Sequence, residues 1–252
     1  MKKTVTIVLL LVIFSGVTLT QAQQATSIPF PKIGFNVGTS SNPGDISVTL
    51  QILFLLTVLS LAPSLMIMTT SYLRIIIVFH FLKTALGTPQ MPPSQLVAGI
   101  ALFMTFFIMA PTWSKVNDQA LKPLMNSQIT PEQAYDKGIQ PIREFMFRNV
   151  RDEDLELFIG LANLNRPNDR NDLPTYVVVP AFVISELRAG FIIGFFLFIP
   201  FLMIDLIVAS ILMSMGMMML PPAMISLPFK ILLFILIDGW HLIIASVVRS
   251  FS

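Results

Sequence analysis

The residues best suited to chemistry form one methionine-rich run. Residues 213–222 read Met-Ser-Met-Gly-Met-Met-Met-Leu-Pro-Pro, and the five thioethers belong to Met213, Met215, Met217, Met218 and Met219. Pro221 and Pro222 lack backbone N–H donors and restrict the residues before them, so we expect the chain to turn here. Thioether side chains are unbranched and polarizable, and a turn that carries several of them makes a soft, adaptable surface. We predict that in a membrane assembly this turn seals a passage that changes shape.

Two other interpretations of the run stay open. Soft sulfur ligands select Cu(I), so the run is compatible with a copper site, and methionines also fill ordinary apolar cores. The chain has no Cys, and no His lies near the run, which weakens the copper interpretation. Placement on a turn favours the seal over core packing. The absence of Cys also excludes a disulfide framework, a thiol nucleophile and a thiolate metal site.

Asp205 lies well inside an apolar stretch. A lone carboxylate there is costly, so it should be paired, hydrogen-bonded or protonated. Lys230, on the next apolar stretch, is the nearest candidate partner of opposite sign, because a tight turn before it would bring it level with Asp205, whereas Arg74 and Lys83 are weaker candidates. Either the pair is structural, within or between subunits, or Asp205 relays protons that drive transport. We favour the structural pair.

Lys230 and Asp238 are eight residues apart, which predicts one helix face, with His241 one turn further. A histidine beside a carboxylate suits a metal ligand set or a pH switch. His80 is the only other histidine in the chain. No complete metal site is visible, and we expect none.

The composition is that of a membrane protein. Hydrophobic residues make up 54% of the 252 residues and charged residues only 12%, about half the charged fraction of a globular domain. The net charge of +2 is too small to argue for a nucleic-acid partner. The zinc-protease, nucleophile-elbow, phosphate-loop and dinucleotide motifs are all missing. We therefore expect no enzyme and no cofactor.

The first 22 residues are predicted to form a cleaved secretory signal. Lys2 and Lys3 precede an apolar run, Val5 to Val17, and a small-x-small site places cleavage after Ala22. Residues 23–45 are rich in Pro, Gly, Ser and Asn, which predicts an extended arm outside the cytoplasm.

Four apolar stretches follow, and each is about as long as a membrane-crossing helix: Ile46 to Met68, Leu96 to Trp113, Ala189 to Met213 and Ala223 to Val248. With a secreted amino terminus, these crossings place the loop from Arg74 to Gln95 in the cytoplasm and the polar block from Ser114 outside. Polar residues and prolines interrupt the stretches, which predicts kinked helices packed against other subunits.

The polar block is predicted to be helical. Thr130-Pro131-Glu132 is a helix start, with a capping Thr, Pro in the first turn and an acidic residue next. Where the block meets the third apolar stretch, we expect Glu186 and Arg188 to form interfacial or intersubunit contacts. The predicted fold is thus all-α and integral to the membrane. Its parts are a signal (1–22), an arm (23–45), a first helical hairpin (46–113), a helical insertion (114–188) and a second hairpin with the methionine loop (189–252).

Several motifs together resemble one family, FliP of the bacterial flagellar type III export gate. The second half carries Pro180-Ala-Phe-Val-Ile-Ser-Glu-Leu-Arg188, Ile199-Pro-Phe-Leu-Met-Ile-Asp205 and Ile225-Ser-Leu-Pro-Phe-Lys230, besides the methionine run and Asp238-Gly-Trp240. The first half adds Ser71-Tyr-Leu-Arg-Ile75 and Ala85-Leu-Gly-Thr-Pro-Gln-Met-Pro-Pro93. The similarity covers Ile46 to Phe251. The secretory signal and the Gly-Thr-Pro-Gln-Met-Pro-Pro loop look more like the flagellar branch than the related injectisome SctR family.

This resemblance implies a function and an assembly. It implies a pore for unfolded flagellar subunits, built from several copies of the chain (a pentamer) with FliQ and FliR, near FlhB and FlhA. It also implies a place in the flagellar basal body at the bacterial inner membrane, with much of the helical mass raised toward the periplasm, and a methionine loop that closes the channel. The alternative function is an ion-coupled secondary transporter that uses Asp205, Lys230 and Asp238. Such transporters commonly show internal repeats, and none is evident here.

Overall fold

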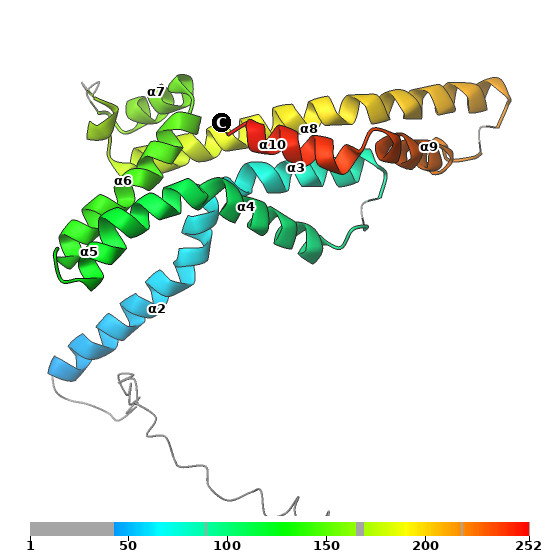
Figure 1. Cartoon of the computed structure of the whole chain (residues 1–252). Coiled ribbons are helices and arrows are strands. Elements are labelled where there is room, and N and C mark those ends of the chain that lie inside the picture. Colours follow the sequence, from blue (N-terminus) through cyan, green and yellow to red (C-terminus); the bar gives the residue numbers. More distant parts are fainter. Residues whose placement is uncertain (1–42, 89, 165–168, 218, 252) are drawn as a thin grey trace, which may run out of the picture. The chain divides into compact units, whose positions relative to one another are not determined.

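The computed structural model describes residues 43–88, 90–164, 169–217 and 219–251, with side chains from Leu50 onward. In these ranges the fold is all-helical, as predicted (Figure 1). The predicted signal with its Ala22 cleavage site, most of the arm and Met218 lie outside the described residues, while the last three arm residues, 43–45, belong to the first helix. The elements are α2 (Pro43–Thr69), α3 (Tyr72–Ala85), α4 (Ser94–Val116), η1 (Asn117–Leu121), α5 (Lys122–Met125), α6 (Pro131–Asn149), α7 (Asp152–Leu161), η2 (Arg170–Asp172), α8 (Thr175–Ser214), α9 (Pro222–Leu236) and α10 (Gly239–Arg249).

The four apolar stretches expected from the sequence are all helical. Three helical segments in the described part are long and apolar enough to cross a membrane: Leu50–Thr69, Ser94–Met125 and Thr175–Ser214. The fourth stretch is a broken span, because α9 and α10 meet at an angle of 65°. The stretch is therefore sharply bent, but the bend lies at Asp238 and not at its internal proline, because Pro228 lies within the continuous helix α9.

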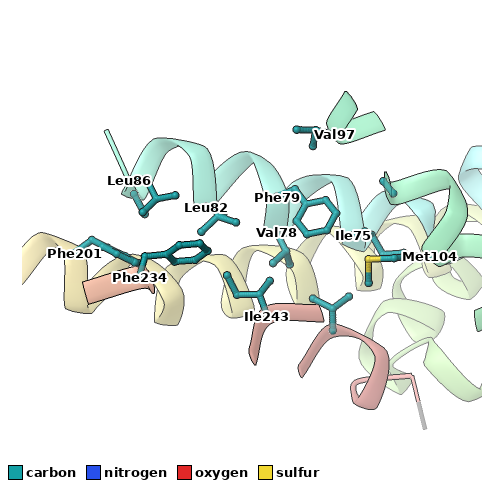
Figure 2. Close-up of a cluster of buried hydrophobic side chains, with 13 residues drawn as sticks. Ile75, Val78, Phe79, Leu82, Leu86, Val97, Met104, Phe201, Phe234 and Ile243 are labelled. Atoms are coloured by element: carbon teal, nitrogen blue, oxygen red, sulfur yellow. The ribbon is translucent and has the colours of Figure 1, made fainter. Parts of the chain in front are cut away.

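The segment expected to be a cytoplasmic loop is instead a helix at the centre of the core. Ile75, Val78 and Leu82 of α3 are almost fully buried. They contribute to a cluster that also draws on α4, α8, α9 and α10 (Figure 2). At 14 residues, α3 is too short to cross a bilayer, so a search for long apolar stretches passes over it.

Two glycines allow α3 to lie close against α8. A Cβ atom on Gly194 would lie 2.5 Å from the ring of Phe81, and one on Gly190 would lie 3.0 Å from Ile77. Small residues four positions apart let two apolar helices approach closely. Gly190-x-x-x-Gly194 is therefore a packing motif that the sequence displays and that our sequence reading missed.

Helix α8 starts earlier than hydropathy predicts. It begins at Thr175 and runs for 40 residues, so the expected boundary after Arg188 falls inside a continuous helix. Its first turns pack on α6 and α7 in a second core that includes Phe145, Leu155 and Phe182. The division of the chain into hairpins and insertion remains a prediction, since one helix serves both parts.

The helix start predicted at Thr130 is confirmed. The Gln133 N–H donates to Thr130 Oγ1 at 3.3 Å, and the Thr130 N–H donates to Gln133 Oε1 at 3.2 Å. These reciprocal bonds form a capping box at the start of α6.

Candidate functional site

The methionine run lies on the turn between α8 and α9, where the sequence places it. Gly216 has φ +74°, and its N–H donates to Met213 O at 3.0 Å, while the Met217 N–H donates to Leu212 O at 3.0 Å. This bond pattern with a left-handed glycine ends a helix in a Schellman motif. Pro222 then opens α9, in the first turn that proline favours.

The four methionines of the run that the structure describes are exposed. Exposed fractions are 97% for Met219, 65% for Met215, 61% for Met213 and 37% for Met217. None of these four belongs to either hydrophobic core. Within the chain, plain core packing is therefore the wrong interpretation for them. A tip of exposed apolar side chains marks a surface that another molecule covers.

Behind the tip, an ion pair joins the two arms. Lys230 Nζ donates to Asp205 Oδ2 at 2.6 Å, and Ser226 Oγ donates to Asp205 Oδ1 at 2.5 Å. The pairing of Asp205 with Lys230 expected from the sequence is thus present. Ser226 was missed, although it lies one turn before Lys230 and hence on the same face of α9. We call residues 201–217 and 219–236, which include both arms, the methionine hairpin.

The burial of this pair is uneven. The Lys230 side chain is 6% exposed, while the Asp205 side chain is 29% exposed. A partly exposed carboxylate inside an apolar segment is tolerated against protein or water, but it is costly against acyl chains. The side of α8 that carries Asp205 is therefore unsuited to lipid.

Asp238 and Lys230 do not share a helix face, contrary to our expectation. Asp238 lies at the break between α9 and α10 in a left-handed conformation, with φ 49° and ψ 56°. Its side chain is exposed. Gly239 follows, and a Cβ there would lie only 2.2 Å from the Phe234 ring. The close contact with Phe234 and the left-handed residue fix the bend, which a count of residues along an ideal helix cannot anticipate.

A second buried cation, Arg74, is bound at the start of α3. Its Nε donates to Glu186 Oε2 at 2.9 Å and its Nη2 donates to Glu186 Oε1. Nη1 donates to the carbonyl and hydroxyl oxygens of Ser250 at 2.7 and 2.9 Å, and Nη2 also donates to Asn149 Oδ1 at 3.4 Å. The Phe251 ring centroid lies 3.8 Å from the Arg74 guanidinium carbon. All five N–H donors of the guanidinium are used. We call these five residues the Arg74 cluster.

This arrangement corrects two expectations. Glu186 is fully buried and bound within its own chain, so it offers no surface for an intersubunit contact. Arg74 binds Glu186 and is not a partner of Asp205. Arg188 lies on the exposed side of α8, and an intersubunit role for it remains a prediction.

The start of α8 is held by a third buried cation, Arg143. Its guanidinium donates to Thr175 Oγ1 at 2.6 Å and to the Asn171 and Leu173 carbonyl oxygens at 3.1 and 2.5 Å. Burial lowers the pKa of Arg143 from its usual value, because the charged form loses water. Three acceptors compensate for that loss, and the contact fixes where the long helix begins.

His, Asp and Glu side chains in the described ranges do not gather in groups of three that would hold a metal ion. His80 and His241 lie on α3 and α10. What the described residues do assemble is a set of internal charge pairs and an exposed sulfur-rich tip. This defines a class: a helical protein whose described part holds several segments long and apolar enough to cross a membrane, with some of its charges paired inside the chain.

The comparisons with known proteins make this class specific. The model of the FliP family matches residues 55–247. Among curated relatives, the flagellar biosynthetic protein FliP of Bacillus subtilis is 55% identical over 216 residues, which cover 86% of this chain and 98% of that protein. The proteins of the same name from Caulobacter vibrioides and Treponema pallidum are 49% identical over 220 residues and 44% identical over 239 residues. These matches cover 87% and 94% of this chain, and 82% and 88% of those proteins. The chain belongs to the FliP family, and the resemblance read from its motifs is confirmed.

Proposed function

We propose that this protein is a pore-forming subunit of the flagellar type III export gate, through which unfolded flagellar subunits pass. The observation that carries the proposal is the methionine hairpin. Its tip holds a methionine that is 97% exposed, on a turn braced by a buried lysine. Flexible thioethers conform to changing shapes and exclude water and ions from a narrow passage. Met213, Met215, Met217 and Met219, with Met218, are the gasket residues of this proposal.

Assembly with other subunits is part of the proposal. Large apolar residues on the free faces of α8 and α9 are exposed in the single chain, Phe196, Leu206 and Leu232 among them. The same α8 arm carries the partly exposed Asp205, so protein neighbours suit this surface better than lipid. The neighbours we propose are further copies of this chain, in a pentamer, with FliQ and FliR, and with FlhB and FlhA close by.

The proposed location is the flagellar basal body at the bacterial inner membrane, with much of the mass raised toward the periplasm.

An ion-coupled transporter is the weaker alternative function. It requires Asp205, Lys230 and Asp238 to converge on one midplane site. Asp205 and Lys230 bind each other, whereas Asp238 lies at the break between α9 and α10 and is exposed.

The test is a leakage measurement on the assembled gate in liposomes. Met215, Met217 and Met219 are replaced together by Ala, and small-ion flux is compared with that of the unchanged assembly. Replacement of Met203 and Met224 is the matched control, because these methionines are also exposed, at 55% and 71%, but lie outside the run. We expect leakage to rise in the first variant only. Equal leakage in both variants, with assembly intact, contradicts the seal.

A further inference from the structure

An apolar cavity separates the methionine hairpin from α10. It has a volume of about 390 Å³ and lies between α8, α9 and α10. Its lining includes Ile193, Pro200, Phe234 and Gly239, and Ser246 is its one polar side chain. The cavity opens to the surface of the single chain, since Phe196 and Leu242 in its lining are 67% and 54% exposed, and this opening leaves the surrounding elements room to move. Figure 2 shows Phe201 of α8 and Phe234 of α9 lying side by side beside Leu82 and Leu86 of α3.

The α8 wall of the cavity contains a break in helical hydrogen bonding. Pro200 lies inside α8 and has no N–H, so the carbonyl of Phe196, four residues earlier, loses its usual donor. Both residues line the cavity. Sharp helix kinks occur at such positions.

The opposite wall of the cavity contains a second break, the bend between helices α9 and α10. Ile237 and Gly239 line the cavity on either side of Asp238, the left-handed residue at the 65° bend. A non-glycine residue in this conformation carries backbone strain, and such positions gather where a chain switches between states. The two weak points of the α8–α9–α10 unit therefore lie around one cavity.

The elements on the two sides of these breaks are held differently. On the far side, the ion pair of Asp205 and Lys230, with Ser226, joins the arms of the hairpin to each other. On the near side, Arg74 binds Ser250 and Phe251, which follow α10, and so fixes α10 to α3 and α8. These polar bonds hold each side together, while across the breaks the two sides meet through apolar packing, with Phe201 and Phe234 in the core that they share with α3.

We propose that the methionine hairpin pivots as one unit about Pro200 and Asp238, and that the cavity takes up the change in packing. This inference rests on the proposed function, in which the hairpin tip must move to admit a chain. The arm from Pro200 to Ser214 is roughly 20 Å long at helical rise. A rotation of about 20°, comparable with an ordinary helix kink, moves its tip by about 7 Å.

The experiment measures distances between pairs of spin labels in the full assembly, with labelled copies diluted by unlabelled ones. The chain has no native Cys, so engineered cysteines carry the only labels. The pair across the hinge joins His80 on α3 to Ile207 on α8. The pair within the hairpin joins Ile207 to Leu232 on α9, and the pair within the body joins His80 to Leu242 on α10. All four positions are exposed in the single chain.

We expect the distance distribution across the hinge to be about twice as wide as the other two. Pro200→Ala restores an N–H donor and should narrow that distribution toward the width of the controls. Pro180→Ala is the matched variant, because Pro180 lies in the same helix but outside the cavity lining, and it should leave the width unchanged. A distribution across the hinge as narrow as the controls overturns the proposal, and so does equal narrowing by both proline variants.

A second variant tests the same proposal in case Pro200→Ala does not fold. Ser246→Leu fills the cavity and changes neither break, and it should also narrow the distribution across the hinge. No narrowing in a folded Ser246→Leu assembly overturns the role of the cavity. Label distances do not depend on conductance, so the hinge can fail while the methionine variants still leak, and the seal can fail while the hinge still moves.

Discussion

The Arg74 cluster and the methionine hairpin both place charge in apolar surroundings, but only the first is complete within the chain. Arg74 has an acceptor for each of its five N–H donors, and Glu186 is fully buried. In the hairpin, the Asp205 side chain is 29% exposed and the methionines reach 97%. The comparison separates a site that is satisfied within the chain from a surface that we propose makes contacts beyond it.

The difference also bears on where lipid can lie. The apolar segment Leu50–Thr69 of α2 has no residue buried within the chain, and it contains no ionisable residue. The hairpin is similarly apolar, but it carries a carboxylate that lipid would not tolerate. Hydropathy alone treats the two as equal, whereas the partly exposed ion pair distinguishes them.

The largest effect should come from breaking the Arg74 cluster. Arg74→Met leaves Glu186 buried without its cation, which should cost about 3–5 kcal/mol of unfolding free energy. The matched control is Arg170→Met, because Arg170 and Asp152 are 53% and 73% exposed, and such pairs contribute about 0–1 kcal/mol. Thermal unfolding in detergent compares the two. Similar midpoints for both variants would show that the cluster does not hold the fold together.

A smaller loss is expected in the hairpin. Lys230→Met leaves Asp205 with one bond from Ser226, and we expect a cost of about 1–3 kcal/mol, reduced because Asp205 is partly solvated. Exchange of the charges (Asp205→Lys with Lys230→Asp) should recover part of what each single change loses. Yield of assembled complex and the unfolding midpoint are the measurements. A double variant no better than the singles would argue against direct pairing.

The smallest effect should come from the methionine tip. Met219→Ala removes an almost wholly exposed side chain and should change unfolding free energy by less than about 0.5 kcal/mol. Met146→Ala, at 1% exposure in the second core, should cost about 2–5 kcal/mol. The same two proteins are then compared by thermal unfolding. A large loss of stability at Met219 would mean that the run contributes to folding, and the contrast between the two regions would weaken.

Much of this architecture could be predicted from the sequence because it depends on local signals. The methionine turn follows from two prolines and a glycine, and the start of α6 follows from its capping Thr. The pairing of Asp205 with Lys230 follows from the length of the turn between their helices. Each of these features is decided by residues close together in the chain.

The features that the sequence analysis predicted wrongly, or did not predict, also have a common cause. Hydropathy predicts a loop at α3 because this helix is too short to cross a membrane, although its apolar face is covered from several sides. Glu186 was assigned to an interface because its partner, Arg74, lies 112 residues earlier. Ser226 was overlooked because a serine in an apolar helix has no distinctive pattern until a carboxylate lies beside it.

The sequence by itself determined the class of protein, the family, the number of apolar stretches and the position of the sulfur-rich turn. These depend on composition and on short-range constraints that act in any fold. Only the tertiary structure decided that Arg74 and Glu186 satisfy each other inside the chain, where α8 begins, and that the fourth stretch breaks at Asp238. Such features arise from contacts between distant segments, since a buried charge is stable only where the fold brings its partners within hydrogen-bonding distance.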